Sequence, residues 1–170
     1  SGKTTFIERL LPILTQKQVK TAVVKHDGHS FEPDVEGTDS YRIRKAGACA
    51  TAVFCDTHSM VVKQKAGTVE DMLEAVDEAD LVLLEGGKNW DFPKIELVRK
   101  GNSERLAGNG RNLLAVATDM EGFQVEKAEL GTCGTVSEDG SEVPVIALDG
   151  YKKAADLILE LLAGGQEAQP

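Results

Sequence analysis

The chain has 170 residues, 41% of them apolar and 28% charged, which is typical of one globular domain with its own core. Its 19 basic and 28 acidic side chains give a net charge of −9, which argues against a nucleic acid or an anionic membrane as partner. Three cysteines without a Cys-x-x-Cys pair, and no apolar run long enough to cross a bilayer, predict a cytoplasmic protein with reduced thiols.

The first part of the chain reads as a helix, a strand and a second helix. Apolar side chains at helical spacing predict a helix over 3–17, in which Pro12 should cause a kink. A short apolar run predicts a buried strand over 20–26, and a polar loop follows it. A second helix is expected over 39–46, ending at Gly47.

The middle of the chain predicts a hairpin and then a return to alternating helix and strand. Two β-rich runs, 49–54 and 59–64, are separated by a polar turn. Thr68 is the expected N-cap of a helix whose apolar face recurs at helical spacing. The run 80–85 is almost wholly apolar and ends in an acid, a pattern typical of a parallel strand buried on both faces.

The last part predicts three more strands and a terminal helix. These elements are expected at 94–99, 113–118, 143–148 and 151–162. Strands alternating with helices predict a three-layer α/β fold with a mostly parallel sheet flanked by helices and a β-hairpin extension. We expect one nucleotide-binding domain over 1–163 and a polar tail over 164–170. The acidic segment 122–142 has no assigned role.

The start of the chain carries a phosphate-binding pattern. Gly2, Lys3 and Thr4 match the last three positions of G-x-x-x-x-G-K-[ST], and the run from Ser1 to Thr5 leads straight into the first helix. Amides at a helix N-terminus bind phosphate, the lysine reaches the β- and γ-phosphates, and the threonine hydroxyl is a ligand of Mg²⁺. The sequence therefore predicts a site for a nucleoside triphosphate and Mg²⁺ here.

The strand and first glycine that precede this pattern in P-loop folds would stand before Ser1. A parallel sheet without a central strand would leave its two neighbours with unpaired amides and an apolar slot. We therefore expect about ten or more further residues upstream in the natural product, enough for one strand and the first half of the loop.

Polar residues at the ends of other strands are candidates for the same site. Glu85 ends a buried strand and precedes two glycines, which allow backbone to approach a ligand closely. Lys25, His26 and His29 lie at or just after the end of the 20–26 strand, which should lie beside the phosphate loop. Asp39 heads the second helix and is either its N-cap, a metal-shell acid or both.

Asp119 directly follows the strand expected at 113–118. A carboxylate there can accept two hydrogen bonds from guanine N1–H and N2–H, a pair that adenine does not offer. Aspartate is also a common turn residue after a strand, so the pattern alone leaves both interpretations open.

Together the runs SGKTT, VVKHDGHSFEPDVEGTDSYRIRKAGA, DLVLLEGGK, PKIELVR and LLAVATD resemble the molybdopterin-guanine dinucleotide biosynthesis adaptor family, MobB. The resemblance implies a GTP-binding homodimer with weak GTPase activity at best, in which β-structure exchanges between subunits. Its implied role is to assist the guanylyltransferase that attaches GMP to molybdopterin, and whether molybdopterin itself binds is left open.

By position, the resemblance implies that the phosphate and Mg²⁺ residues are Gly2, Lys3, Thr4 and Thr5, and that those around them are Lys25, His26, His29, Asp39 and Glu85. Asp39 and Glu85 are the candidate catalytic carboxylates and, with Thr4, the candidate metal-binding residues.

Three other functions are alternatives on the same fold. A small-molecule kinase would need lid arginines, for which Arg105 and Arg111 are candidates. A metal-insertion GTPase would be expected to carry a histidine-rich tract or paired cysteines, which this sequence lacks. A scaffold whose nucleotide only orders the dimer differs from the adaptor in whether hydrolysis matters.

Overall fold

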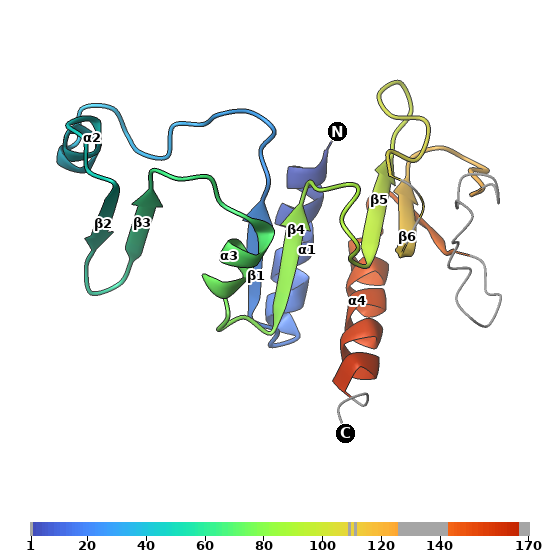
Figure 1. Ribbon diagram of the computed structural model, residues 1–170. Coiled ribbons are helices and arrows are strands. Elements are labelled where there is room, and N and C mark those ends of the chain that lie inside the picture. Colours follow the sequence, from blue (N-terminus) through green and yellow to red (C-terminus); the bar gives the residue numbers. More distant parts are fainter. Residues whose placement is uncertain (1, 109, 111, 126–142, 167–170) are drawn as a thin grey trace.

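The computed structural model describes residues 2–108, 110, 112–125 and 143–166 and has the expected α/β architecture (Figure 1). Strand β1 (Thr21–Lys25) pairs in parallel with β4 (Leu81–Glu85). Strands β5 (Lys94–Val98), β6 (Leu113–Thr118) and β7 (Val145–Ala147) form a second parallel sheet in that order. The mostly parallel strand pairing predicted from the sequence is confirmed, although the described residues divide it between two sheets.

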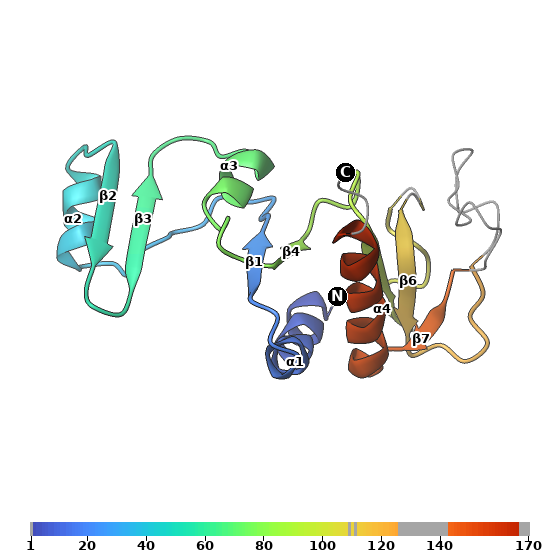
Figure 2. The same ribbon diagram turned by 90° about the horizontal axis from the view of Figure 1, so that it is seen from below.

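Helices flank these parallel strands on both sides. Helix α1 (Lys3–Gln16) and helix α3 (Val69–Glu74) lie on opposite sides of β1 and β4, and α4 (Tyr151–Gln166) lies beside α1 (Figure 2). The rings of Phe6 and Tyr151 meet with centroids 5.2 Å apart, which joins the two long helices near their N-termini. No helix in the described part of the chain is long and apolar enough to span a membrane.

The buried face of α1 builds the main core. Phe6, Leu10 and Leu14 recur at helical spacing and are almost completely buried. They belong to one apolar cluster with side chains of the parallel sheets and of α4, including Ala117, Ile146, Ala154, Ala155 and Ile158. The helix continues through Pro12, which lies on its exposed side.

The predicted hairpin is present and forms an arm to one side of the body. Strands β2 (Ala50–Phe54) and β3 (Ser59–Lys63) pair antiparallel, and α2 (Asp39–Lys45) lies against them (Figure 1). The Arg44 side chain of α2 is buried, pairs with Glu32 of the preceding loop and lies over the ring of Tyr41. We call this unit, residues 39–63, the hairpin arm.

The capping predictions are confirmed at two helix ends and wrong at a third. Thr68 caps α3 through a capping box with Asp71, as predicted from the sequence. Gly47 follows α2 with a φ of 113°, a conformation that favours glycine. The alternative that Asp39 caps α2 is wrong, because the Thr38 hydroxyl accepts the Tyr41 amide and Asp39 is the first helical residue.

Two elements differ from the sequence prediction by more than one residue at an end. Helix α4 continues to Gln166, so the start of the expected polar tail is helical. Strand β7 covers only three residues of the six predicted. Most of the segment 122–142 lies outside the described residues.

The packing of α1 generates a stability prediction. Leu14 is completely buried, whereas Leu161 on α4 is 43% exposed. We expect Leu14→Ala to lower the free energy of unfolding by about 2–5 kcal/mol, because it leaves a cavity in the core. Leu161→Ala, the matched control, should cost less than about 1 kcal/mol. Urea unfolding followed by circular dichroism measures both, and equal losses would contradict the placement of α1.

Candidate functional site

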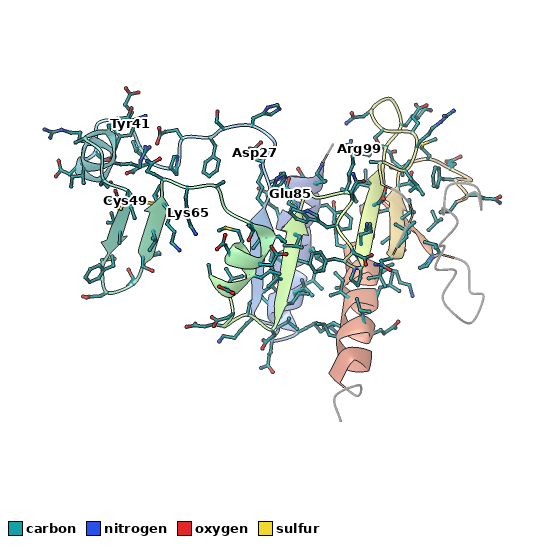
Figure 3. The ribbon with its side chains drawn as sticks, in the orientation of Figure 1. Asp27, Tyr41, Cys49, Lys65, Glu85 and Arg99 are labelled. Atoms are coloured by element: carbon teal, nitrogen blue, oxygen red, sulfur yellow. The ribbon has the colours of Figure 1, made fainter. Side chains whose placement is uncertain are left out.

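The ends of the parallel strands gather beside the start of α1. Lys25 and Glu85 are paired residues at the last positions of β1 and β4. Figure 3 shows Asp27, Glu85 and Arg99 at this same end of the molecule, near the N-terminus. The carboxyl ends of parallel strands are where α/β proteins bind ligands, so this edge is the candidate site.

The phosphate-loop residues open α1 in a conformation suited to an anion. Gly2 adopts a left-handed conformation with a φ of 80°, and its carbonyl accepts the Phe6 amide at 2.9 Å. No side chain caps this end of the helix, and its first turn contains no acidic residue. Lys3, Thr4 and Thr5 are exposed, whereas Ser1 lies outside the described residues. The helix therefore presents its positive end without a carboxylate of its own.

A hydrogen bond joins the phosphate loop to β4. The Thr4 hydroxyl donates to Oε1 of Glu85 at 2.9 Å, across 81 positions of sequence. Hydroxyl and carboxylate oxygens are hard donors of the kind that Mg²⁺ prefers. In the described part of the chain no three His, Cys, Asp or Glu side chains could hold a metal by themselves. The arrangement suits Mg²⁺, which is usually bound by few protein oxygens together with phosphates and water.

Two glycines after Glu85 allow the chain to turn tightly over the end of β1. Gly86 has a φ of 108°, and a Cβ atom there would lie 2.9 Å from the His26 carbonyl oxygen. Gly87 also has a positive φ, and a Cβ there would overlap the ring of Trp90. The His26 ring meets Trp90 edge-on at 5.3 Å, and the His26 amide donates to the Glu85 carbonyl at 2.9 Å. These contacts fix the backbone around Glu85.

The remaining residues of the KHDGH run are exposed at the same edge. Lys25 lies opposite Glu85 in the strand register, so the structure brings these two predicted residues together. His29 follows in the loop, where its amide donates to Oδ1 of Asp27 at 3.3 Å. Of the two predicted histidines, His26 is adjacent to Glu85 and His29 lies on the loop.

Asp39 lies elsewhere. It belongs to the hairpin arm, its side chain is 92% exposed, and it forms an ion pair with Arg42 of the same helix at 3.5 Å. Figure 3 shows the neighbouring Tyr41 far from Glu85. The described chain therefore does not bring Asp39 to Thr4 and Glu85, because the helix that it begins packs on the hairpin rather than on the parallel sheet.

Asp119, which follows β6, contacts the residues that follow the neighbouring strand β5. Its Oδ1 accepts the Lys100 amide at 2.8 Å, and its Oδ2 lies 3.8 Å from Nε of Arg99. The carboxylate is thus at the predicted edge, oriented toward the end of β5. Arg105, a candidate lid arginine, is exposed in the loop that follows, and Arg111 lies outside the described residues.

Sequence reasoning missed Arg99 and Trp90. Trp90 supports His26, and Arg99 lies against Gly2. The position of Arg99 directly after a strand was the available signal, since the ends of parallel strands share one edge.

The parallel strands, the glycine-lysine-threonine turn into α1 and the acid at the end of β4 define a P-loop NTPase-like α/β protein. The sequence model of the family described as "Molybdopterin guanine dinucleotide synthesis protein B", MobB, matches residues 1–119. The chain belongs to the MobB family.

Curated relatives agree with this assignment. The molybdopterin-guanine dinucleotide biosynthesis adapter protein of Haemophilus influenzae is 34% identical over 123 residues, covering 70% of this chain and 69% of that protein. The protein of the same name from Escherichia coli is 32% identical over 128 residues, covering 71% and 73%.

Solved structures share the fold. The structure titled Bacillus subtilis MobB matches with a TM-score of 0.69 and 28% identity, covering 94% of this chain and 90% of that one. A crystal structure titled molybdopterin-guanine biosynthesis protein B matches with a TM-score of 0.66 and 24% identity over 96% and 93%. These likenesses confirm the fold class predicted from the sequence.

Proposed function

We propose that this chain is a cytoplasmic, GTP-binding adaptor of molybdenum cofactor biosynthesis that assists formation of molybdopterin guanine dinucleotide. Membership of the MobB family and the names of the curated relatives support the role in molybdenum cofactor biosynthesis. The observation that carries the nucleotide proposal is the Thr4–Glu85 hydrogen bond at the start of α1. Exposed free thiols at Cys49 and Cys55 suit a reducing compartment.

The proposed nucleotide site uses the residues that surround this hydrogen bond. Amides of the first turn of α1 and the Lys3 ammonium would hold the phosphates. Thr4 and Glu85 would hold Mg²⁺, which neutralises phosphate charge when bound. Thr5, Lys25 and His26 complete the polar edge, and His29 extends it along the loop. Of the two candidate catalytic carboxylates, Glu85 lies at this edge and Asp39 does not, so any hydrolysis that Glu85 supports by orienting water should be weak.

The proposed partner is the molybdenum cofactor guanylyltransferase, and the proposed assembly is a homodimer formed through the hairpin arm. Four apolar side chains of the arm are exposed, with Phe54 at 84% and Val61 at 62%, together with Ile43 and Val53. Exposed apolar groups gathered on one unit are typical of a protein interface. The edges of a two-stranded hairpin also offer unpaired backbone groups to a second copy.

Replacing Lys3 tests the phosphate site. We expect Lys3→Ala to weaken GTP binding about ten- to a hundred-fold, because a hydrogen bond to a charged group contributes about 1.5–3 kcal/mol. The exposed position of Lys3 should leave the melting temperature unchanged. Isothermal titration with GTP and Mg²⁺ measures the affinity, and an unchanged dissociation constant would remove the phosphate-loop assignment.

Replacing Asp119 tests guanine selectivity. Asp119→Asn keeps an acceptor for the Lys100 amide but no longer accepts both guanine protons. We expect lower GTP affinity and a smaller preference for GTP over ATP, measured by parallel titrations of the two nucleotides. A preference that survives the substitution would mean that guanine is recognised by another group.

Replacing Phe54 tests the proposed dimer. A carboxylate at the most exposed apolar position of the arm would be costly to bury in an interface. We expect light scattering to give the mass of a dimer for the unaltered chain and of a monomer for Phe54→Asp at micromolar concentration. Leu161→Asp on α4 is the control and should stay dimeric. A monomeric unaltered chain would contradict the homodimer.

A further inference from the structure

Arg99 lies directly against the glycine that begins the phosphate-binding helix. It follows β5, and its Nη1 atom is 2.9 Å from where a Cβ atom on Gly2 would stand. The guanidinium carbon Cζ is 3.7 Å from the same point. The absence of a side chain on Gly2 is therefore what allows the guanidinium to reach the start of α1. Figure 3 shows Arg99 at the same end of the strands as Glu85.

Arg99 brings a cation to the positive end of α1. The guanidinium meets the positive end of a 14-residue helix that has no acidic residue in its first turn. On the other side of the helix start, the Glu85 carboxylate is engaged by the Thr4 hydroxyl. A cation at a helix N-terminus is unfavourable unless an anion lies beside it.

Asp119 compensates Arg99 only in part. Its Oδ2 is 3.8 Å from Nε of Arg99, which is beyond hydrogen-bond distance. That Nε atom is buried and has no hydrogen-bond partner among the described residues. Both side chains are more than a third exposed, at 39% and 38%, so solvent weakens the pair. The guanidinium is thus held at the helix start and is only partly compensated there.

The backbone of Arg99 is fixed in a tight turn. Its amide donates to the Ser103 carbonyl at 2.7 Å, and the Ser103 amide donates back at 3.0 Å. Gly101, with a φ of 73°, makes this turn, and the Lys100 amide is anchored on Asp119 of the next strand. The turn joins the ends of β5 and β6, so the base of the Arg99 side chain is pre-positioned.

We propose that Arg99 is a phosphate-binding residue of the nucleotide site, placing its guanidinium on phosphoryl oxygens above Gly2. This inference rests on the proposed nucleotide function. Arginine suits the task because its planar, permanently charged group donates two parallel hydrogen bonds to phosphate. An anion bound there would also complement the positive end of α1. Because Arg99 contacts phosphate and not the base, it contributes equally to GTP and ATP.

The test compares Arg99→Ala and Arg99→Lys with Arg9→Ala, which removes one exposed arginine further along α1. Isothermal titration of the full chain uses GTP, ATP and inorganic tripolyphosphate, each with Mg²⁺. We expect Arg99→Ala to bind all three about ten- to a hundred-fold more weakly, with the GTP-to-ATP ratio unchanged. Arg99→Lys should recover part of the loss, because it restores charge without the two-pronged geometry. Arg9→Ala should bind as the unaltered chain does.

Melting temperatures of the three variants show whether each is folded. If Arg99→Ala does not fold, Arg99→Lys still tests the inference. Unchanged tripolyphosphate affinity in a folded Arg99 variant would overturn the inference and leave the proposed GTP function standing. A tripolyphosphate loss in a chain without GTP preference would support the inference and contradict the guanine proposal. An unaltered chain that binds none of the three ligands would overturn both.

Discussion

The site depends on the way in which the buried face of α1 holds two separate parallel sheets. Phe6, Leu10 and Leu14 belong to a cluster that includes Leu83 of β4 and Leu97 of β5. In the described part of the chain, β4 and β5 belong to different sheets and share no strand pairing. Both sheets pack on the same face of α1, so a loss of this packing would act on the site as well as on stability.

This dependence explains why the polar contacts at the site are made between different elements. Thr4 on α1 reaches Glu85 on β4, whereas Gly2 at the start of the same helix meets Arg99 after β5. The helix thus contributes to contacts with both sheets within its first turn. Each of these contacts is short-ranged, so a small rotation of α1 would disturb both.

Much of the fold was predictable because its signals are local. The stripe that includes Phe6 and Leu10 identified α1, the capping pattern at Thr68 identified α3, and the apolar run ending in Glu85 identified β4. The pairing of Thr4 with Glu85 was also anticipated, because a helix-start motif and a strand-end acid meet at a common edge in parallel α/β proteins.

The remaining features depend on three-dimensional packing that the sequence pattern does not specify. The placement of Asp39 depends on α2 packing against the hairpin rather than against the parallel sheet. The contact of Arg99 with Gly2 joins residues far apart in sequence, and nothing in the pattern around Arg99 distinguishes it from other charged residues after strands. The support of His26 by Trp90 likewise depends on the turn made by Gly86 and Gly87.

The hairpin arm and the β6 region differ in how much protein shields their backbone. Most residues of β2 and β3 are exposed, whereas five of the six residues of β6 are buried. Amide protons of the arm would therefore exchange with solvent through small local openings. Those of β6 would exchange only when the whole domain unfolds. A second copy seated on the arm would slow exchange there alone. Hydrogen exchange thus separates the behaviour of the exposed hairpin arm from that of the domain core within one chain.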